Sequence, residues 1–119
     1  MEEEARRSGC PIATTLDLVG DKWTLVLVRD MVNGKRRYKE FLASPEGIPT
    51  NILAARLKKM VSANLAVKTP YVERPMRFEY ALTEKGYAML PVLQEMCRWG
   101  NRFFPETWTV PEEFMELQP

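Results

Sequence analysis

The hydrophobic pattern of the chain changes its period near residue 64, and this change limits the folds open to it. Before that point, apolar residues recur every three or four positions, as on one face of a helix. After it, residues 65–72 and 77–82 alternate between apolar and polar side chains, as strands do, and 73–76 separate them. The pattern predicts several helices, then one two-stranded hairpin, then a return to helix.

Three helices and one short helical turn are expected before the hairpin. Residues 12–19 carry apolar side chains at positions 12, 16 and 19, the spacing of one helical face. A second helix over 21–32 begins at Asp21, whose carboxylate accepts from free backbone amides, and ends at an Asn-Gly pair. A short helix covers 38–43, and a longer one runs from Pro49 to about residue 63.

The chain returns to helix after the strands. Thr83 is a suitable cap for a long helix over 84–104, which Pro91 interrupts and is expected to kink. Pro70 lacks a backbone donor, so it limits its part of the first strand to an edge or a bulge. The fold class predicted from these elements is mainly α with a small β-hairpin (α+β).

The last helix carries two adjacent apolar stripes, which is more apolar surface than a domain of this size covers with its own chain. The surplus predicts a symmetric homodimer whose seam is formed by the N- and C-terminal helices. The residues predicted to line this dimer interface are Ile12, Leu16, Leu90, Leu93, Met96, Cys97, Trp99 and Phe103.

The net charge of +1 hides a division along the chain. Residues 35–77 hold ten lysines and arginines against three glutamates, a net charge of +7. The rest of the chain holds seven basic and thirteen acidic residues, a net charge of −6. A polyanion would therefore be attracted to the middle of the chain, and nucleic acid is the expected partner.

The order of the predicted elements is that of a winged helix-turn-helix. The third long helix has a polar, basic outer face, and a helix of that width fits the major groove of DNA. The hairpin that follows carries arginines near its tip, within reach of phosphates or the minor groove. In a dimer, two such helices one DNA turn apart would read a pseudo-palindromic operator in double-stranded DNA.

The predicted DNA contacts fall on the third helix, the basic turn before it and the hairpin. Thr50, Asn51 and Arg56 are expected to read base edges, while the turn and the wing hold phosphate. The competing interpretation makes Thr50 and Asn51 helix-start residues and the charges a solvated face. The full set is Thr50, Asn51, Ala54, Ala55, Arg56, Lys58, Lys59, Arg36, Arg37, Tyr38, Arg74 and Arg77.

The sequence offers little for catalysis. Histidine, the usual general base and commonest metal ligand, is absent, so no catalytic residue, metal site or cofactor is predicted. Cys10 precedes Pro11 at the start of the first helix, where the free amide groups favour the reactive thiolate. Cys10 is therefore a candidate redox sensor, although a small packing residue is an equal alternative. Cys97 lies in mid-helix and is expected to pack.

The residues also resemble the HxlR family of bacterial transcriptional regulators over roughly 10–99. The matching stretches are Cys10-Pro11, LVGDKWT at 18–24, Arg37-Tyr38 with Glu40-Phe41, Ile48 with Asn51 and Leu53, Arg56-Leu57-Lys58, and YALTEKG at 80–86. The resemblance implies a dimeric winged-helix protein that binds operator DNA, in which the cysteine of the Cys-Pro pair senses oxidants or electrophiles in some members. Asn64-Leu65 replaces the usual Gly-Leu, and asparagine tolerates the same left-handed backbone.

The domain organisation expected from these patterns is a single domain with two ends. Residues 1–9 are a flexible N-terminus, 10–104 the winged-helix DNA-binding and dimerisation domain, and 105–119 an acidic C-terminal tail. No apolar run reaches the ~18 residues that span a bilayer, and the charged N-terminus does not resemble a signal peptide. No membrane partner is predicted, and the expected location is cytoplasmic.

Three alternatives stay open at this point. A winged helix can bind protein instead of DNA, and a regulator can respond to a small ligand without any redox role. A thiol-based redox enzyme is a third reading, but the sequence has neither a second cysteine near Cys10 nor a histidine.

Overall fold

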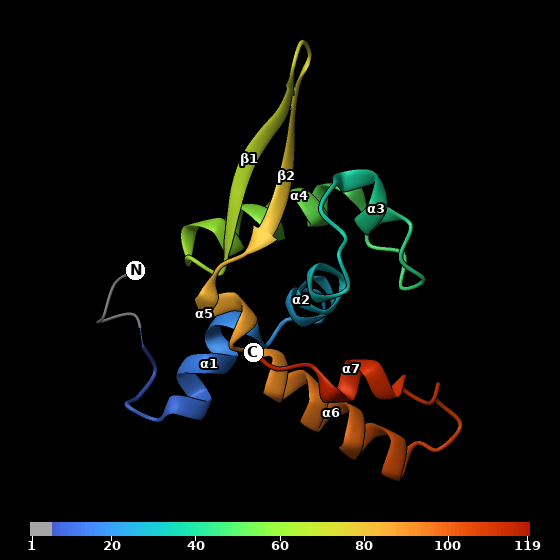
Figure 1. Ribbon diagram of the computed structural model, residues 1–119. Coiled ribbons are helices and arrows are strands. Elements are labelled where there is room, and N and C mark those ends of the chain that lie inside the picture. The colour runs from blue at the N-terminus through green and yellow to red at the C-terminus, as the bar shows by residue number, and fades with distance from the viewer. Residues whose placement is uncertain (1–5) are drawn as a thin grey trace.

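The computed structural model describes residues 6–119 as helices and one hairpin (Figure 1). The predicted flexible N-terminus, 1–9, lies partly outside the described residues. In chain order the elements are α1 (Pro11–Val19), α2 (Thr24–Val32), α3 (Tyr38–Leu42), α4 (Thr50–Ser62), β1 (Ala66–Glu73), β2 (Met76–Leu82), α5 (Glu84–Tyr87), α6 (Leu90–Phe103) and α7 (Glu112–Glu116). The predicted α+β class is confirmed.

The elements divide between two ends of the molecule. In Figure 1, α3, α4 and the hairpin occupy the upper end, α1, α6 and α7 the lower end, and α2 lies between them. Leu27 and Val28 of α2 are completely buried, as are Phe41 of α3 and Leu53 and Leu57 of α4. The apolar run of the second helix is therefore the centre of the core, which explains why it is apolar on nearly every side.

The start of α2 depends on Asp21. Its Oδ2 accepts from the backbone amides of Trp23 and Thr24, each at 3.0 Å, and its Oδ1 accepts from the Thr24 hydroxyl. The predicted capping contacts, two and three residues on, are confirmed, although α2 itself begins three residues later than expected. The intervening residues form a turn that Asp21 closes.

The hairpin pairs Ala66 with Leu82 at its base and Glu73 with Met76 at its tip. Its register is irregular between Pro70 and Val72, as the missing donor of Pro70 predicts. Asn64, just before β1, has φ of 62°, so the left-handed backbone expected from the sequence is present. This turn brings β1 back across the end of α4.

The predicted long helix over 84–104 is wrong in one respect, because it is two helices. Thr83 caps α5 by accepting from the Gly86 amide at 3.1 Å, as predicted, but α5 ends at Tyr87. Pro91 cannot donate to the Tyr87 carbonyl and its ring crowds that turn, so the chain restarts as α6 at Leu90. The kink expected at Pro91 is thus a complete break.

The C-terminal tail folds back onto α6. The side chain of Gln94, buried in α6, donates from Nε2 to the carbonyl oxygens of Phe114, Met115 and Leu117 at 3.0–3.2 Å. Phe114, in α7, joins the core. None of the helices within 6–119 is both long and apolar enough to cross a bilayer.

Candidate nucleic-acid interface

The outer face of α4 is open to solvent at the predicted reading positions. Leu53, Leu57 and Met60 point into the core, which turns the opposite side of the helix outward. The exposed residues on α4 include Thr50, Asn51, Ala54, Ala55 and Lys58. The two alanines leave this face shallow beside Asn51, so the backbone of another molecule could approach it closely.

Arg56 and Lys59 lie on a flank of α4 that meets the α1–α2 link. Arg56 Nε donates to Asp21 Oδ2 at 2.9 Å, and the Arg56 side chain is less than one-third exposed. Lys59 Nζ donates to the Asp17 carbonyl at 3.4 Å. The structure therefore places Arg56 against the start of α2, whereas Asn51 and Lys58 face outward and Lys59 is exposed beside α1. The basic side chains of α4 therefore point in two directions and do not form the single face expected from the sequence.

The basic turn before α3 is held against the wing. Arg37 pairs with Glu79 of β2, with N–O distances of 3.1 Å, and its guanidinium lies 3.7 Å from the centre of the Tyr71 ring. The Tyr80 amide donates to the Arg36 carbonyl at 2.8 Å, which ties the turn to β2 as a third strand would be tied. Arg36 itself is exposed.

The turn is also ordered from within. Glu40 accepts from the backbone amides of Arg36 and Arg37 at 2.7 and 3.0 Å, and these bonds lower the pKa of its carboxyl. Tyr38 is half-buried, with its ring 6.1 Å from that of Tyr80. Burial, followed by the contact with Tyr38, raises the pKa of Tyr80 to about 12. Tyr38 is thus as much a packing residue as a surface one.

The wing presents cations along its length. Arg74 and Arg77 near the tip are exposed, as predicted. Lys68 on β1 lies with its ammonium 4.1 Å from the centre of the Phe78 ring and was not among the predicted site residues. From the sequence, Lys68 counts only toward the charge of the segment, and in the structure every residue of β1 after Ala66 is exposed. Lys68 adds a third cation to the hairpin.

The charged elements share one end of the molecule. Figure 1 places α3, α4 and the hairpin together, and the exposed cations of the turn, of α4 and of the wing all belong to these elements. The acidic tail lies at the other end with α6. The basic segment and the acidic tail, which are separate in the sequence, therefore also lie at separate ends of the molecule.

The opposite end exposes apolar side chains. Ile12 and Leu16 of α1 are exposed, and Trp99, 61% exposed, stacks with Phe103 at 5.2 Å between ring centres. Met96 is 53% exposed on the same helix. Together these five side chains form what we call the apolar stripe.

Two of the predicted seam residues are core residues instead. Leu90 is fully buried and Leu93 is 7% exposed within the single chain, because these positions face α2 while the neighbouring stripe faces outward. Cys97 is half-buried beside them. Val92, 43% exposed, continues the apolar stripe and was not among the predicted interface residues.

The two cysteines have different surroundings. Cys10 is exposed at the N-cap of α1, directly before Pro11. Burial raises the pKa of the Cys97 thiol, which keeps it in the unreactive protonated form. Among residues 6–119, no group of three or more histidine, cysteine or acidic side chains is arranged to hold a metal ion.

Comparison with known proteins gives one consistent result. A model described as HxlR-like helix-turn-helix matches residues 18–108. YdeP of Bacillus subtilis, named as an uncharacterised HTH-type transcriptional regulator, is 34% identical over 95 residues, which are 80% of this chain and 74% of that protein. Rv3095 of Mycobacterium tuberculosis, named likewise, is 36% identical over 100 residues, 84% of this chain but 63% of that longer protein.

Solved structures agree with the sequence matches. The crystal structure of PA1607 superposes with a TM-score of 0.78 at 38% identity, over 90% of this chain and 75% of that one. The redox regulator HypR in its reduced form gives a TM-score of 0.72 at 32% identity, over 83% of this chain and all of that one.

Proposed function

Because the chain belongs to the HxlR-like helix-turn-helix family, we propose that it is a transcriptional regulator that binds double-stranded DNA. The observation that carries this function is the outward face of α4, which the rest of the described chain leaves uncovered beside a cationic wing. A recognition helix needs such a face in order to enter the major groove.

The residues divide by role. Thr50 and Asn51, in the first turn of α4, are placed to meet base edges, and the small Ala54 and Ala55 let the helix approach the groove floor. Lys58 is placed to meet phosphate. Arg56, which bonds to Asp21 in the α1–α2 link, acts by fixing the angle of α4, and the exposed Lys59 is placed to meet phosphate with Lys58.

Phosphate contacts on either side fix the register. Arg36 and Arg37 lie in the turn before α3, and Arg74, Arg77 and Lys68 extend along the wing. Arg37 is braced by Glu79 and Tyr71, so its guanidinium is already ordered before DNA arrives. Ordered cations lose less conformational freedom on binding than free ones.

The operator-binding form is a homodimer. The apolar stripe on α1 and α6 lies at the end opposite the DNA-binding face, where pairing with a second copy leaves both recognition helices free. Two copies related by a two-fold axis would read a pseudo-palindromic site.

One selection experiment tests this function. The purified protein is mixed with sheared genomic DNA, bound fragments are sequenced, and affinity for the enriched site is compared with affinity for a random duplex at several salt concentrations. The proposal predicts an enriched, inverted-repeat motif and affinity that falls steeply with salt. Absence of any salt-sensitive DNA binding would instead favour a winged-helix module for protein partners.

A second candidate function is a thiol switch at Cys10. Two observations favour it: the thiol is exposed at the N-cap of α1, and the redox regulator HypR shares the fold at 32% identity. Diamide takes two electrons from two thiols as a disulfide forms, here the Cys10 thiols of the two copies in the proposed dimer, and this should change DNA affinity in the wild type and not in Cys10→Ser. An equal change in both proteins would place the oxidation at Cys97, and no change in either would leave a small-ligand regulator without a redox role.

A further inference from the structure

A cavity of about 610 Å³ lies between α2, α6 and the segment that leads into α7. That volume is within the range of pockets that hold small molecules, ~300–1,000 Å³. One wall comes from α2, a second from α6, and residues 107–111 with Phe114 form the third. Gln94 bonds hold the Phe114 side of this third wall, and Asn101 of α6 holds its start by donating to Thr107 Oγ1 and the Trp108 carbonyl at 3.0 and 2.9 Å.

The cavity has a mainly apolar lining, with charged side chains where α2 ends. Leu25, Val26, Met96 and Phe114 are among its apolar lining residues. Arg29, Asp30 and Lys35 line this polar end, and Arg29 is paired there with two carboxylates, those of Asp30 and Glu46. A pocket with a long apolar wall and few convergent polar groups suits an apolar molecule with a single polar group.

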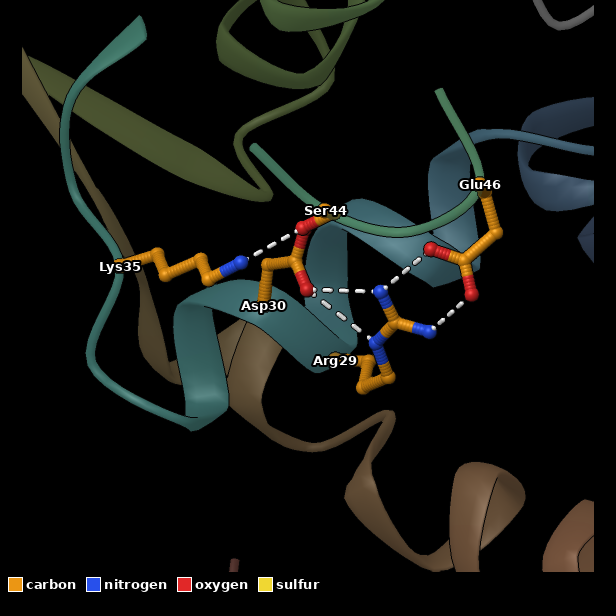
Figure 2. Close-up of polar contacts among 5 residues, drawn as sticks. All are labelled: Arg29, Asp30, Lys35, Ser44 and Glu46. Atoms are coloured by element: carbon orange, nitrogen blue, oxygen red, sulfur yellow. Dashed lines mark hydrogen bonds and ion pairs between the residues drawn. The ribbon is translucent and has the colours of Figure 1, made fainter. Parts of the chain in front are cut away.

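At the polar end, Lys35 is the cation that keeps hydrogen-bond donors for a further acceptor. Both Asp30 oxygens are used, Oδ1 by the Arg29 guanidinium at 2.8 Å and Oδ2 by the Ser44 hydroxyl at 2.6 Å (Figure 2). Lys35 Nζ donates to Ser44 Oγ at 2.7 Å, and among residues 6–119 no carboxylate lies within ion-pair distance of it. An ammonium has three donors, so Lys35 retains donors for a further acceptor.

We propose that this cavity is an effector site for a small, mainly apolar monoanion. The apolar body would lie against α2 and α6, and its anionic group would accept from Lys35 at the polar end. The site is distinct from the DNA-binding face and from Cys10.

The same polar end is joined to the segment that leads into α4. Arg29 donates to both oxygens of Glu46 at 2.7 and 2.8 Å, and this pair raises the pKa of Arg29 and lowers that of Glu46 (Figure 2). Ser44 and Glu46 belong to the turn between α3 and α4. An anion that draws Lys35 or Arg29 toward the cavity therefore acts on the turn that positions the recognition helix.

Binding is tested with two matched fluorescent probes. 8-Anilinonaphthalene-1-sulfonate is an apolar anion, and N-phenyl-1-naphthylamine has the same rings without the sulfonate. Gly100→Leu fills the cavity, since a Cβ at Gly100 meets nothing within 4 Å. Gly9→Leu is its control, because Gly9 has the same open surroundings and does not line the cavity.

The proposal predicts that Gly100→Leu weakens both probes by at least about tenfold, while Gly9→Leu binds them as the wild type does. Lys35→Gln should weaken the sulfonate probe and leave the neutral one unchanged. Melting temperatures confirm that each variant is folded. Equal binding of the sulfonate probe to wild type and Gly100→Leu would overturn the site, and equal loss of both probes in Lys35→Gln would overturn the choice of an anion.

The effector role rests on the proposed DNA-binding function and has its own readout. The sulfonate probe at saturation should change wild-type affinity for the selected operator by about fivefold or more, the usual scale of coupling between sites. Gly100→Leu should show no such change. Probe binding without any effect on operator affinity would overturn the effector role alone, whereas a protein that binds no DNA even without probe would contradict the proposed function instead.

Discussion

Arg56, on the flank of the recognition helix α4, donates to the carboxylate of Asp21, the residue that also closes the turn leading into α2. One side chain therefore joins the start of the core helix to the helix that is proposed to read DNA. Burial opposes ionisation of Asp21, but the bonds from Thr24, Trp23 and Arg56 outweigh it and lower its pKa from 3.8 to about 2. The charged form of Asp21 thus stabilises the fold.

Removing that charge should destabilise the protein in a pH-dependent way. We expect Asp21→Asn to lower the free energy of unfolding by about 1.5–3 kcal/mol at pH 7, the usual contribution of hydrogen bonds to a charged group. Since the pKa is lower in the folded state, the contribution is complete above about pH 4 and is lost as pH falls toward 2, with about half gone by pH 3. Urea unfolding of both proteins at pH 7 and pH 3 measures this. A difference that stays constant over this range would contradict the assignment.

Asn51→Ala should weaken operator recognition without changing the stability of the fold. Asn51 is exposed and its loss removes a base contact, so we expect affinity for the selected operator to fall by 1–3 kcal/mol, about 5–150-fold, with little change for random DNA. Its melting temperature should not change. Competition binding with operator and random duplexes measures both affinities.

Arg56→Ala is the matched comparison on the same helix. Because Arg56 bonds to Asp21, its loss should lower thermal stability and weaken binding to operator and random DNA alike. A selective loss of operator affinity with unchanged stability would instead return Arg56 to the base-reading residues.

The wing arginines should be visible in the salt dependence of binding. If Arg74 and Arg77 each contact one phosphate, replacing either with alanine lowers the slope of log affinity against log salt by about one. Arg98→Ala on α6 is a suitable control, since Arg98 lies at the end remote from the wing and pairs with Glu95. A slope unchanged in both wing variants would show that these cations remain in solvent.

Met96→Glu should disrupt the dimer. Met96 is exposed on the apolar stripe, and a buried unpaired carboxylate in an interface costs several kcal/mol. We expect analytical ultracentrifugation to give a dimer for wild type and a monomer for the variant, with weaker operator binding. Val67→Glu, at an exposed apolar position on the wing, should remain dimeric. An unchanged sedimentation coefficient for Met96→Glu would place the seam elsewhere.

Gln94→Leu should release the C-terminal segment. The substitution leaves three carbonyl oxygens of residues 114–117 without their shared donor, although the volume of the side chain is nearly kept. We expect faster proteolysis after residue 104 and a modest fall in melting temperature. Mass spectrometry of a timed digest identifies the cut. Equal digestion of wild type and variant would show that the segment is held by its other contacts, the packing of Phe114 and the Asn101 bonds to Thr107 and Trp108.

Most of the fold could be predicted because local signals agreed with one another. The period change near residue 64, the amide contacts of Asp21 and the left-handed Asn64 each depend on neighbours in the sequence, and all are present, although the cap of α2 itself is Trp23. Pro91 was recognised as an interruption, but whether a proline kinks or breaks a helix depends on what its flanks pack against. Gly86 supplies that packing here, since a Cβ there would lie 2.1 Å from the Leu65 carbonyl oxygen.

The parts that sequence reasoning missed are long-range. Arg56 and Lys58 have the same charge and lie two positions apart, and only the position of Asp21 makes one a brace and leaves the other outward. The burial of Leu90 and Leu93 likewise depends on which side of α6 packs against α2. The cavity needs three separate segments. Val110, Phe114 and Leu117, at helical spacing in the acidic tail, were the available signal for the third.

The location of residues 107–111 has an evolutionary consequence. They form a wall of the cavity at the end of the molecule away from α4 and the wing. Mutations in that short stretch can reshape the chamber while leaving target-site preference intact, and changes on α4 can do the reverse. Relatives that share this fold can thus change the effector that the proposed site binds independently of the operator that α4 reads.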